Sequence, residues 1–439
     1  MQPSTVRRHP SLSARRARSQ GGELDKGMTM GRQHRPDYWL VILMAALLSI
    51  GLIVVYAISP ALAQASHVST SHFVTKQLLA IGLSVIAFTL TSQIPLRVWR
   101  SYAIPLLIFA AIATLLALAL PVNPAYPAHR WVRLGGSFSF QSVELVKFAV
   151  LIALAGFFTE RITKGWLNDF SKTLKPLLIA VLVTGIVIAG PQKLHAQSDL
   201  GSMAVLIAIV GVMCFIAGLP LKRLTMIVAV LAVGAALVIL PSQYRRERLA
   251  TFVHPESNCQ DAGYQACQAL IAVGSGGMVG LGLGRSVQAY GYLPEAANDS
   301  IFAIYAEKFG FVGSIILLAL FTAFFNRIKT IAERAPDNFS RLLVSGVLAW
   351  LSVQSIINIG AMIGLLPLKG ITLPLISYGG TSVVFVAAAI GLVFQVSRFT
   401  TFTAPINVML DRKGKDSHEN RHDRRRLRGA YHPDSSGRA

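Results

Sequence analysis

Charged residues are scarce in this chain. Only 14% of its 439 residues are charged, whereas 53% are apolar, and the mean hydropathy is +0.55. A soluble globular domain carries about a quarter charged residues, so this sequence has too few to cover a water-exposed surface. The solvent of most of the chain is therefore predicted to be lipid.

Short motifs for common catalytic centres are also missing. The sequence has three cysteines, no H-E-x-x-H, no paired-cysteine zinc motif and neither nucleotide-binding glycine fingerprint. Cys214 falls in an apolar stretch and is expected to be a small core residue. Cys259 and Cys267 share one loop, where a disulfide and two free thiols both stay open, because spacing alone does not decide between them.

Apolar blocks near the length needed to cross a bilayer, roughly 20 residues, recur along the chain. They are predicted to be helices, because a lone strand would leave backbone amides unpaired in lipid. The first block is long enough to remain as a span and is not read as a cleavable signal peptide. The sequence thus predicts an all-α polytopic membrane protein with about ten transmembrane helices, at residues 39–58, 78–94, 102–120, 143–158, 174–189, 201–219, 224–240, 301–325, 342–363 and 376–396.

Much of the net charge of +21 lies in two tails, residues 1–37 and 399–439, which flank a membrane domain at 38–398. We expect each tail to be solvated and disordered and not to bind nucleic acid. Basic residues beside spans stay in the cytoplasm, so both termini are predicted to be cytoplasmic. Short loops predicted to lie inside carry further basic residues: Arg97, Arg161, Lys222 and Arg327.

The segment 241–298 is far longer than the other connections and is predicted to lie outside. Its mixed composition favours a functional loop over filler. Its glycines, at 274–284, are typical of a flexible or re-entrant turn in which backbone approaches backbone.

Several ionisable residues lie inside or beside the spans. Glu144 and Lys147 are three apart and share a helix face, and at 1.5 Å per residue Lys147 should lie on the order of 10 Å deep. Charged groups at such depth usually face a polar cavity, although a purely structural ion pair is the alternative. Asp199, Asp299 and Lys369 border the same outer side, where either aspartate could instead be a helix N-cap.

This one-sidedness separates two classes of function. A transporter or flippase usually carries its site near the bilayer midplane, between repeated halves, and neither feature is visible in the sequence. An enzyme that acts on a lipid-linked substrate from outside would place its polar groups at one end of the spans, and this reading is preferred.

Several motifs resemble those of the SEDS (shape, elongation, division, sporulation) family, which contains FtsW, RodA and SpoVE. The similar segments run in the family's order from the third span to the tenth: residues 130–135, 138–147, 197–201, 264–284, 292–295, 299–307, 358–367 and 377–382. Residues 280–288 are more similar to the FtsW branch, with RodA as the alternative. Five positions depart from the family pattern. Ser142 and Ser198 replace proline, which suggests looser turns, Ala297-Asn298 replaces His-Thr, and Lys369 replaces threonine.

The resemblance implies a peptidoglycan glycosyltransferase that polymerises lipid II at the outer face of the inner membrane during septal cell-wall synthesis. A RodA-type elongation polymerase and a lipid II flippase are the alternatives. Asp299 takes the place of the family's catalytic aspartate. A single carboxylate suffices as base, because the donor already carries a pyrophosphate leaving group, whereas glycosidases generally need a pair.

The resemblance also implies a divalent cation, Mg²⁺ or Mn²⁺, with Asp299 as a ligand and positive charge at Lys147, Arg130, Arg245, Arg246 and Arg248. Substrate contacts are predicted at Glu144, Lys147, Arg130, Asp199, Arg246, Lys369 and Ser377. The implied partners are a class B penicillin-binding protein transpeptidase and other divisome membrane proteins, with no nucleic acid.

The predicted topology can be tested with reporter fusions placed after Arg334 and within residues 257–262. They should report opposite compartments, cytoplasmic for the first and external for the second, because basic residues mark the inner loops. The same compartment for both would contradict the ten-span arrangement.

Overall fold

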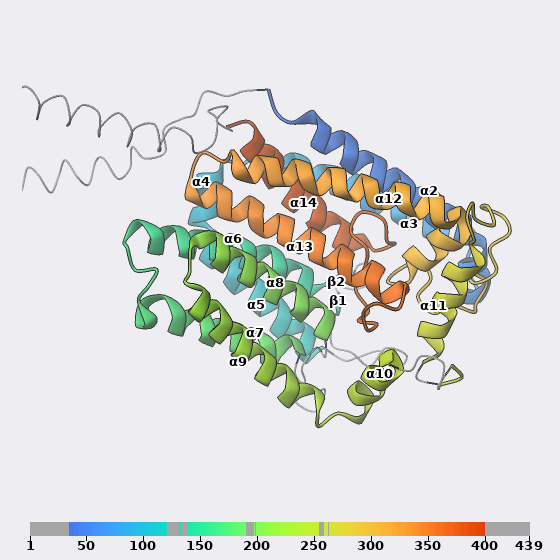
Figure 1. The fold of residues 1–439 in the computed structure, drawn as a ribbon. Coiled ribbons are helices and arrows are strands. Elements are labelled where there is room, and N and C mark those ends of the chain that lie inside the picture. Colours follow the sequence, from blue (N-terminus) through green and yellow to red (C-terminus); the bar gives the residue numbers. More distant parts are fainter. Residues whose placement is uncertain are drawn as a thin grey trace, which may run out of the picture. The chain divides into compact units, whose positions relative to one another are not determined.

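The computed structural model describes residues 35–120, 131–133, 139–189, 197, 199–253, 259–261 and 263–399. These residues belong to one compact unit, and a second unit, 401–439, lies outside them. The two predicted tails therefore fall almost entirely outside the described part of the chain and stay predictions. Within it, the fold is a set of long helices joined by short connections (Figure 1).

The helices run the length of the unit and are numbered in chain order. The first half contains α2 (Tyr38–Ser66), α3 (His72–Gln93), α4 (Leu96–Ser101), α5 (Ala103–Ala119), α6 (Ser142–Thr163), the π-helical turn η1 (Phe170–Leu174) and α7 (Lys175–Ala189). The second half contains α8 (Leu200–Ala217), α9 (Leu221–Ile239), α10 (Gln243–Val253), α11 (Tyr264–Ser275), α12 (Ile301–Glu333), α13 (Asn338–Met362) and α14 (Gly380–Ser397). Two short antiparallel strands, β1 (Trp131–Arg133) and β2 (Ser139–Gln141), precede α6.

Each of the ten predicted spans coincides with a helix, which confirms the all-α polytopic fold. Among the described residues, eight helices are long and apolar enough to cross a membrane. The other two predicted spans are α5, a shorter apolar helix of 17 residues, and α9, with 19 residues. The long apolar windows account for this agreement, because hydropathy and length alone decide whether a segment can cross lipid.

Several boundaries differ from the prediction. Helix α2 continues to Ser66, past the expected end at 58, and α3 begins at His72, where 78 was expected. Helix α12 continues to Glu333, past the expected end at 325, and α14 begins at Gly380 where 376 was expected. The predicted loop 241–298 contains two helices, α10 and α11. These are short and flanked by glycine or polar residues, so they carry no span-length apolar signal.

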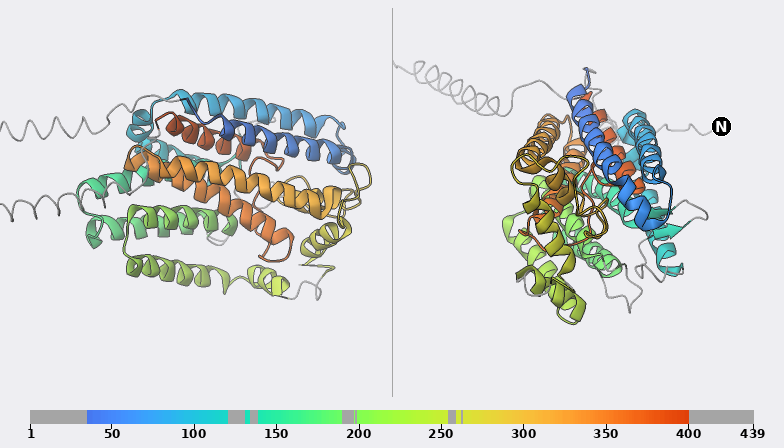
Figure 2. Two further views of the ribbon diagram at one scale, coloured as in Figure 1. Left: turned by 45° about the horizontal axis from the view of Figure 1, so that its top comes forward. Right: turned by 90° about the vertical axis from the view of Figure 1, so that its right-hand side faces the viewer.

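Helix α13 is the centre of the packing and contacts α6, α8, α11, α12 and α14. Figure 2 shows it enclosed by these neighbours, with α3 and α9 toward the periphery. Lipid provides no hydrophobic driving force between helices, so small residues that allow close approach matter. A Cβ on Gly346 of α13 would lie 2.3 Å from Leu151 Cδ1, and one on Gly391 of α14 only 2.0 Å from Thr91 Oγ1.

A polar contact closes the end of the bundle at which α2 begins. Arg327 of α12 donates to Asp37 over 3.0 Å, and the backbone N–H of Asp37 donates to Ser397 Oγ of α14 over 3.1 Å. Asp37 also caps α2 through the N–H of Trp39. Asp37 thus joins three helices, through its carboxylate and its backbone N–H, at the end opposite to the polar cluster described next.

Candidate functional site

Polar side chains gather at one end of the helices. Helices α6, α8 and α12 begin at this end, α13 ends there, and the connection between α13 and α14 lies among them. The chain therefore brings together residues more than 200 positions apart in sequence.

The buried core of this cluster is an ion pair on α6. Lys147 Nζ donates to Glu144 Oε1 over 2.8 Å and to Gln354 Oε1 of α13 over 3.1 Å. The ammonium also lies 5.1 Å from the centre of the Trp350 ring, and Trp350 Nε1 donates to the same Gln354 oxygen over 2.8 Å. Glu144 and Lys147 are 3% and 0% exposed, so the pair is fully withdrawn from solvent, as the structural alternative requires.

One carboxylate oxygen of this ion pair does not take part in it. Glu144 Oε2 is buried and has no hydrogen-bond partner among the residues that the structure describes. An unsatisfied buried carboxylate oxygen is energetically unfavourable. Glu144 therefore has an acceptor to offer to a donor that enters the site.

Two amides of α13, Gln354 and Asn358, connect this pair to the other side of the site. They are four residues apart and so lie on one face of the helix. Gln354 Nε2 donates to the carbonyl of Thr372 over 2.9 Å, and Asn358 Nδ2 donates to the carbonyls of Asp299 and Ile371, both over 2.7 Å. The sequence did not predict that Gln354 links Lys147 to this loop. The signal for it was the presence of two amide side chains in a largely apolar span.

Asp299 lies two residues before Ile301, the first residue of α12. The N-cap of this helix is Ser300, so the N-cap alternative for Asp299 is wrong. A Cβ on Gly370 would lie 3.5 Å from Asp299 Oδ2, which places the carboxylate against the loop that follows α13. Gly370 has φ +64°, a backbone conformation that favours glycine.

The backbone before Asp299 is held by the loop that leads into α14. Ser377 Oγ donates to the carbonyl of Asn298 over 2.6 Å and accepts from the N–H of Leu373 over 2.7 Å. The N–H of Tyr378 donates to the carbonyl of Ala297 over 2.8 Å. Burial raises the pKa of the Tyr378 phenol above its ordinary value of 10.0, so this side chain stays protonated at neutral pH.

Asp199 occupies a different kind of position. Its carboxylate accepts from the N–H of Ser202 over 2.9 Å and from Ser202 Oγ over 2.8 Å, and it caps α8. It is 1% exposed. The N-cap alternative therefore describes its observed contacts. A Cβ on Gly201, two residues on, would lie 2.8 Å from the carbonyl oxygen of Lys369, so Lys369 packs beside this cap.

The serine at the turn before α6 accepts a hydrogen bond. Ser142 is fully buried, and Gln197 Nε2 donates to its hydroxyl over 2.6 Å. The Ser142 hydroxyl thus supplies an acceptor that proline lacks, and the expectation of a looser turn stays a prediction. Ser198 lies outside the described residues.

The predicted basic residues of the long loop are not gathered into this cluster. Arg246 is exposed on α10, and no hydrogen bond or ion pair joins its side chain to another described residue. Arg130 and the side chains of Arg245 and Arg248 lie outside the described part of the structure. Within that part, no group of three His, Cys, Asp or Glu residues could hold a metal ion.

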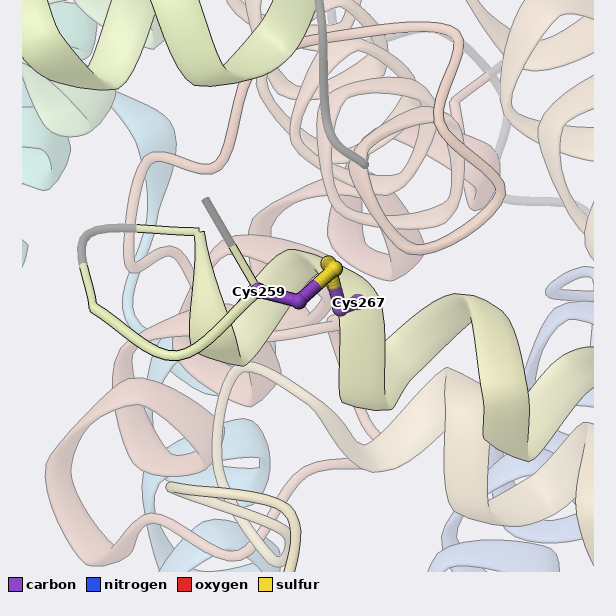
Figure 3. Close-up of a disulfide and its surroundings, with 2 residues drawn as sticks. All are labelled: Cys259 and Cys267. Atoms are coloured by element: carbon purple, nitrogen blue, oxygen red, sulfur yellow. A yellow bond between two sulfur atoms is a disulfide. The ribbon is translucent and has the colours of Figure 1, made fainter. Parts of the chain in front are cut away.

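A disulfide restrains the segment beside Asp299. Cys259 and Cys267 are bonded, with their Cα atoms 5.6 Å apart (Figure 3). Cys267 lies on α11, and Gln265, two residues earlier, donates to Ser300 Oγ over 3.2 Å. The bond thus fixes the start of the helix that contacts the residue next to Asp299.

Comparison with known proteins gives the family of this arrangement. A model of the cell cycle protein family FtsW/RodA/SpoVE matches residues 38–402. The chain belongs to this family. It is 37% identical to the probable peptidoglycan glycosyltransferase FtsW of Saccharophagus degradans over 374 residues, which are 83% of this chain and 92% of that protein. It is 34% identical to the stage V sporulation protein E of Bacillus subtilis, over 84% of this chain and 98% of that protein.

Solved structures of the family share the fold. A chain of a peptidoglycan synthase complex, described as coordinating polymerization and crosslinking, matches with a TM-score of 0.65 and 27% identity, over 83% of this chain and 98% of that one. The rod shape determining protein RodA of Thermus thermophilus matches with a TM-score of 0.60 and 26% identity, over the same shares. The predicted family is confirmed, and the protein is an integral membrane protein.

The buried ion pair predicts a sharp difference between single and double variants. Lys147→Met alone should destabilise the protein by about 3–5 kcal/mol, because it leaves Glu144 as an uncompensated buried charge, whereas Glu144→Leu/Lys147→Met should regain most of the loss. Thermal unfolding of the purified protein in detergent measures both. The pair Glu160–Lys164, at 2.6 Å on the far end of α6 and half-exposed, is the control, and its double variant should change little. A Lys147→Met protein as stable as the wild type would contradict the pair's structural role.

Proposed function

We propose that this protein is a peptidoglycan glycosyltransferase that polymerises lipid II at the outer face of the bacterial inner membrane, with Asp299 as the catalytic base. The observation that carries the proposal is the position of the Asp299 carboxylate, beside the N-cap of a spanning helix and against Gly370. The names of the glycosyltransferase relatives support the same activity. All polar groups of the site lie at one end of the spans, which favours an enzyme over a midplane transporter.

The chemistry needs one base. In glycosyl transfer from a lipid-linked donor, the acceptor sugar hydroxyl attacks the anomeric carbon, the bond to the pyrophosphate breaks, and the hydroxyl proton must leave. Asp299 accepts this proton when its carboxylate lies within hydrogen-bond range of the hydroxyl. The pyrophosphate departs as a stable anion and needs no proton from the protein.

The hydrogen bonds around Asp299 position it for this step. Asn358 holds its carbonyl, and Ser377 holds the carbonyl of the preceding residue. Because both bonds act on the backbone, they hold the main chain from which the Asp299 side chain extends. Such preorganisation is worth more in a low-dielectric site than in water.

A divalent cation fits this set of donors. The protein supplies the Asp299 carboxylate, while the nearby carbonyls of Asn298, Asp299 and Ile371 already accept hydrogen bonds. Mg²⁺ typically binds one or two carboxylates and completes its shell with water and substrate phosphates, so a cluster of three protein ligands is not required. When bound, the cation would neutralise charge on the departing pyrophosphate. Lys147 would add positive charge from the side of α6.

The partner and the location follow from the same proposal. We expect a class B penicillin-binding protein to act with this protein, since a structural relative belongs to a complex that couples polymerization to crosslinking. The similarity of residues 280–288 to the FtsW branch favours the division septum. Both termini are expected in the cytoplasm, which places Asp299 on the outer face.

The variant Asp299→Asn tests the catalytic base. Polymerisation should fall by roughly 10²–10⁴-fold, because an amide cannot accept the hydroxyl proton. The assay is strand synthesis from labelled lipid II by protein that is folded and bound to its transpeptidase. Asp337→Asn is the matched control: Asp337 caps α13 at the opposite end, and asparagine caps about as well as aspartate. Near-wild-type synthesis by Asp299→Asn would refute the assignment.

The double variant Glu144→Leu/Lys147→Met separates structure from function at the ion pair. We expect it to fold and insert but to lose polymerisation, because it removes the positive charge that Lys147 adds for the pyrophosphate and the Glu144 oxygen that can accept from a donor entering the site. The same lipid II assay applies, with the Glu160→Leu/Lys164→Met protein as control. Retained synthesis in the folded double variant would assign the pair to helix packing alone.

A further inference from the structure

Helix α12 is interrupted at Gly310, and a loop enters the break. Gly310 has φ +65° and ψ −163°, far from helical values. In a regular helix the N–H groups of Phe311 and Val312 would donate to the carbonyls of Glu307 and Lys308. Here those N–H groups donate to the carbonyls of Gly277 and Met278, over 2.8 and 3.0 Å.

The two freed carbonyls are also taken by the loop. The N–H groups of Leu281 and Gly282 donate to Glu307 and Lys308 over 2.9 and 3.0 Å. The segment 277–282 thus replaces two helical hydrogen bonds with four of its own. Non-helical backbone is tolerated at membrane depth only where protein satisfies its polar groups in this way.

Glycine is required where the two backbones meet. A Cβ on Gly280 would lie 2.2 Å from the carbonyl oxygen of Lys308, and one on Gly310 would lie 2.3 Å from the backbone nitrogen of Gly280. Both glycines have positive φ. The glycine-rich stretch therefore packs its backbone directly against the backbone of α12. The turn that the sequence predicts is held in place by this contact.

Two buried charged side chains of α12 fix the rest of the loop. Glu307 is fully buried and accepts from Ser286 Oγ over 2.5 Å and from the N–H groups of Val287 and Gln288 over 2.8 and 3.1 Å. Lys308 Nζ donates to the carbonyl of Leu283 over 2.9 Å. On the side of the loop that faces α12, these polar groups are thus hydrogen-bonded.

The opposite side of the loop is apolar and uncovered. Met278 is 65% exposed and Val279 80%, and their neighbours Leu281 and Leu283 are exposed as well. The hydrogen bonds to Phe311 and Val312 place this surface beside the exposed apolar face of α12, which continues through Phe311, Ile315 and Ile316. A continuous exposed apolar surface of this kind marks a contact with lipid or with another protein.

The depth of the segment favours lipid. Arg327 follows the apolar run of α12 and marks its far end, and Phe311 lies sixteen residues earlier, about 24 Å away at 1.5 Å per residue. The hydrocarbon core is about 30 Å thick. Phe311, and Met278 with it, would then lie within the outer part of that core.

We propose that residues 277–283 form a re-entrant segment whose side chains Met278, Val279, Leu281 and Leu283 insert among the lipid acyl chains of the outer leaflet. The exposed Arg285 follows where the chain would return to the headgroups. The segment lies between the disulfide-restrained α11 and the residues that lead to Asp299, so it anchors the outer loop in the bilayer. The lipid contact does not depend on the proposed enzymatic activity.

Nitroxide labels at Met278→Cys and Val279→Cys, each in a Cys214→Ala background, test the insertion. The protein is reconstituted without partners in vesicles of phosphatidylethanolamine and phosphatidylglycerol, and collision with oxygen is compared with collision with a water-soluble nickel chelate. Two positions on α12 calibrate the scale: Ile316→Cys, on its exposed apolar face, and Glu333→Cys, at its polar end. Met278→Trp in vesicles of brominated lipid gives an independent reading by fluorescence quenching, measured as the quenching in excess of that of the wild-type protein, which has five tryptophans of its own.

We expect both loop labels to prefer oxygen, as at Ile316, and the tryptophan to be quenched by the brominated chains. Accessibility to the nickel chelate like that at Glu333, with no quenching of the tryptophan, would overturn the proposal and leave a protein partner as the cover of this surface. Because neither readout uses catalysis, an inactive preparation does not affect the result.

Discussion

The Lys147 ammonium is the charge around which the site is organised. A cation on a membrane-spanning helix is tolerated only when acceptors surround it, and here Glu144 and Gln354 provide them, with the Trp350 ring beside the charge. Gln354 can accept from Lys147 and Trp350 only with its amide nitrogen turned the other way, toward the carbonyl of Thr372. Gln354 thus connects the buried Lys147 to the loop after α13, which lies against Asp299.

The same constraint acts on the backbone. Irregular segments at the ends of spanning helices must find partners for every N–H and C=O, because lipid offers none. Asn358, Ser377 and the N–H of Tyr378 meet this need around residues 297–299. The break at Gly310 does so for the loop 277–282. The first set of contacts holds the residues that lead into α12, and the second involves α12 itself.

This economy of polar groups suits a reaction that needs little from the protein. A donor with a good leaving group requires a base, a positive environment and exclusion of water. One carboxylate, that of Asp299, and a few buried groups can supply them. Glycosidases, which must protonate a poor leaving group, place two carboxylates together. The separation of Asp299 from the buried Glu144 by the amides of α13 is consistent with a single base.

The sequence by itself determined the class of protein, the ten helices and the family, because span length, apolar content and short motifs are local properties. It also pointed to Glu144, Lys147 and Asp299, since charges beside spans are costly and therefore conspicuous. Only the tertiary structure decided that Asp199 caps α8, that Asp299 does not cap α12, and that Cys259 and Cys267 are bonded. It alone revealed Gln354 as the link between Lys147 and the loop near Asp299, and Gly310 as the break that receives residues 277–282. The contacts of Gln354 and of the break at Gly310 join positions from 18 to 207 residues apart. Hydropathy along one segment carries no information about the partner that packing will bring to it.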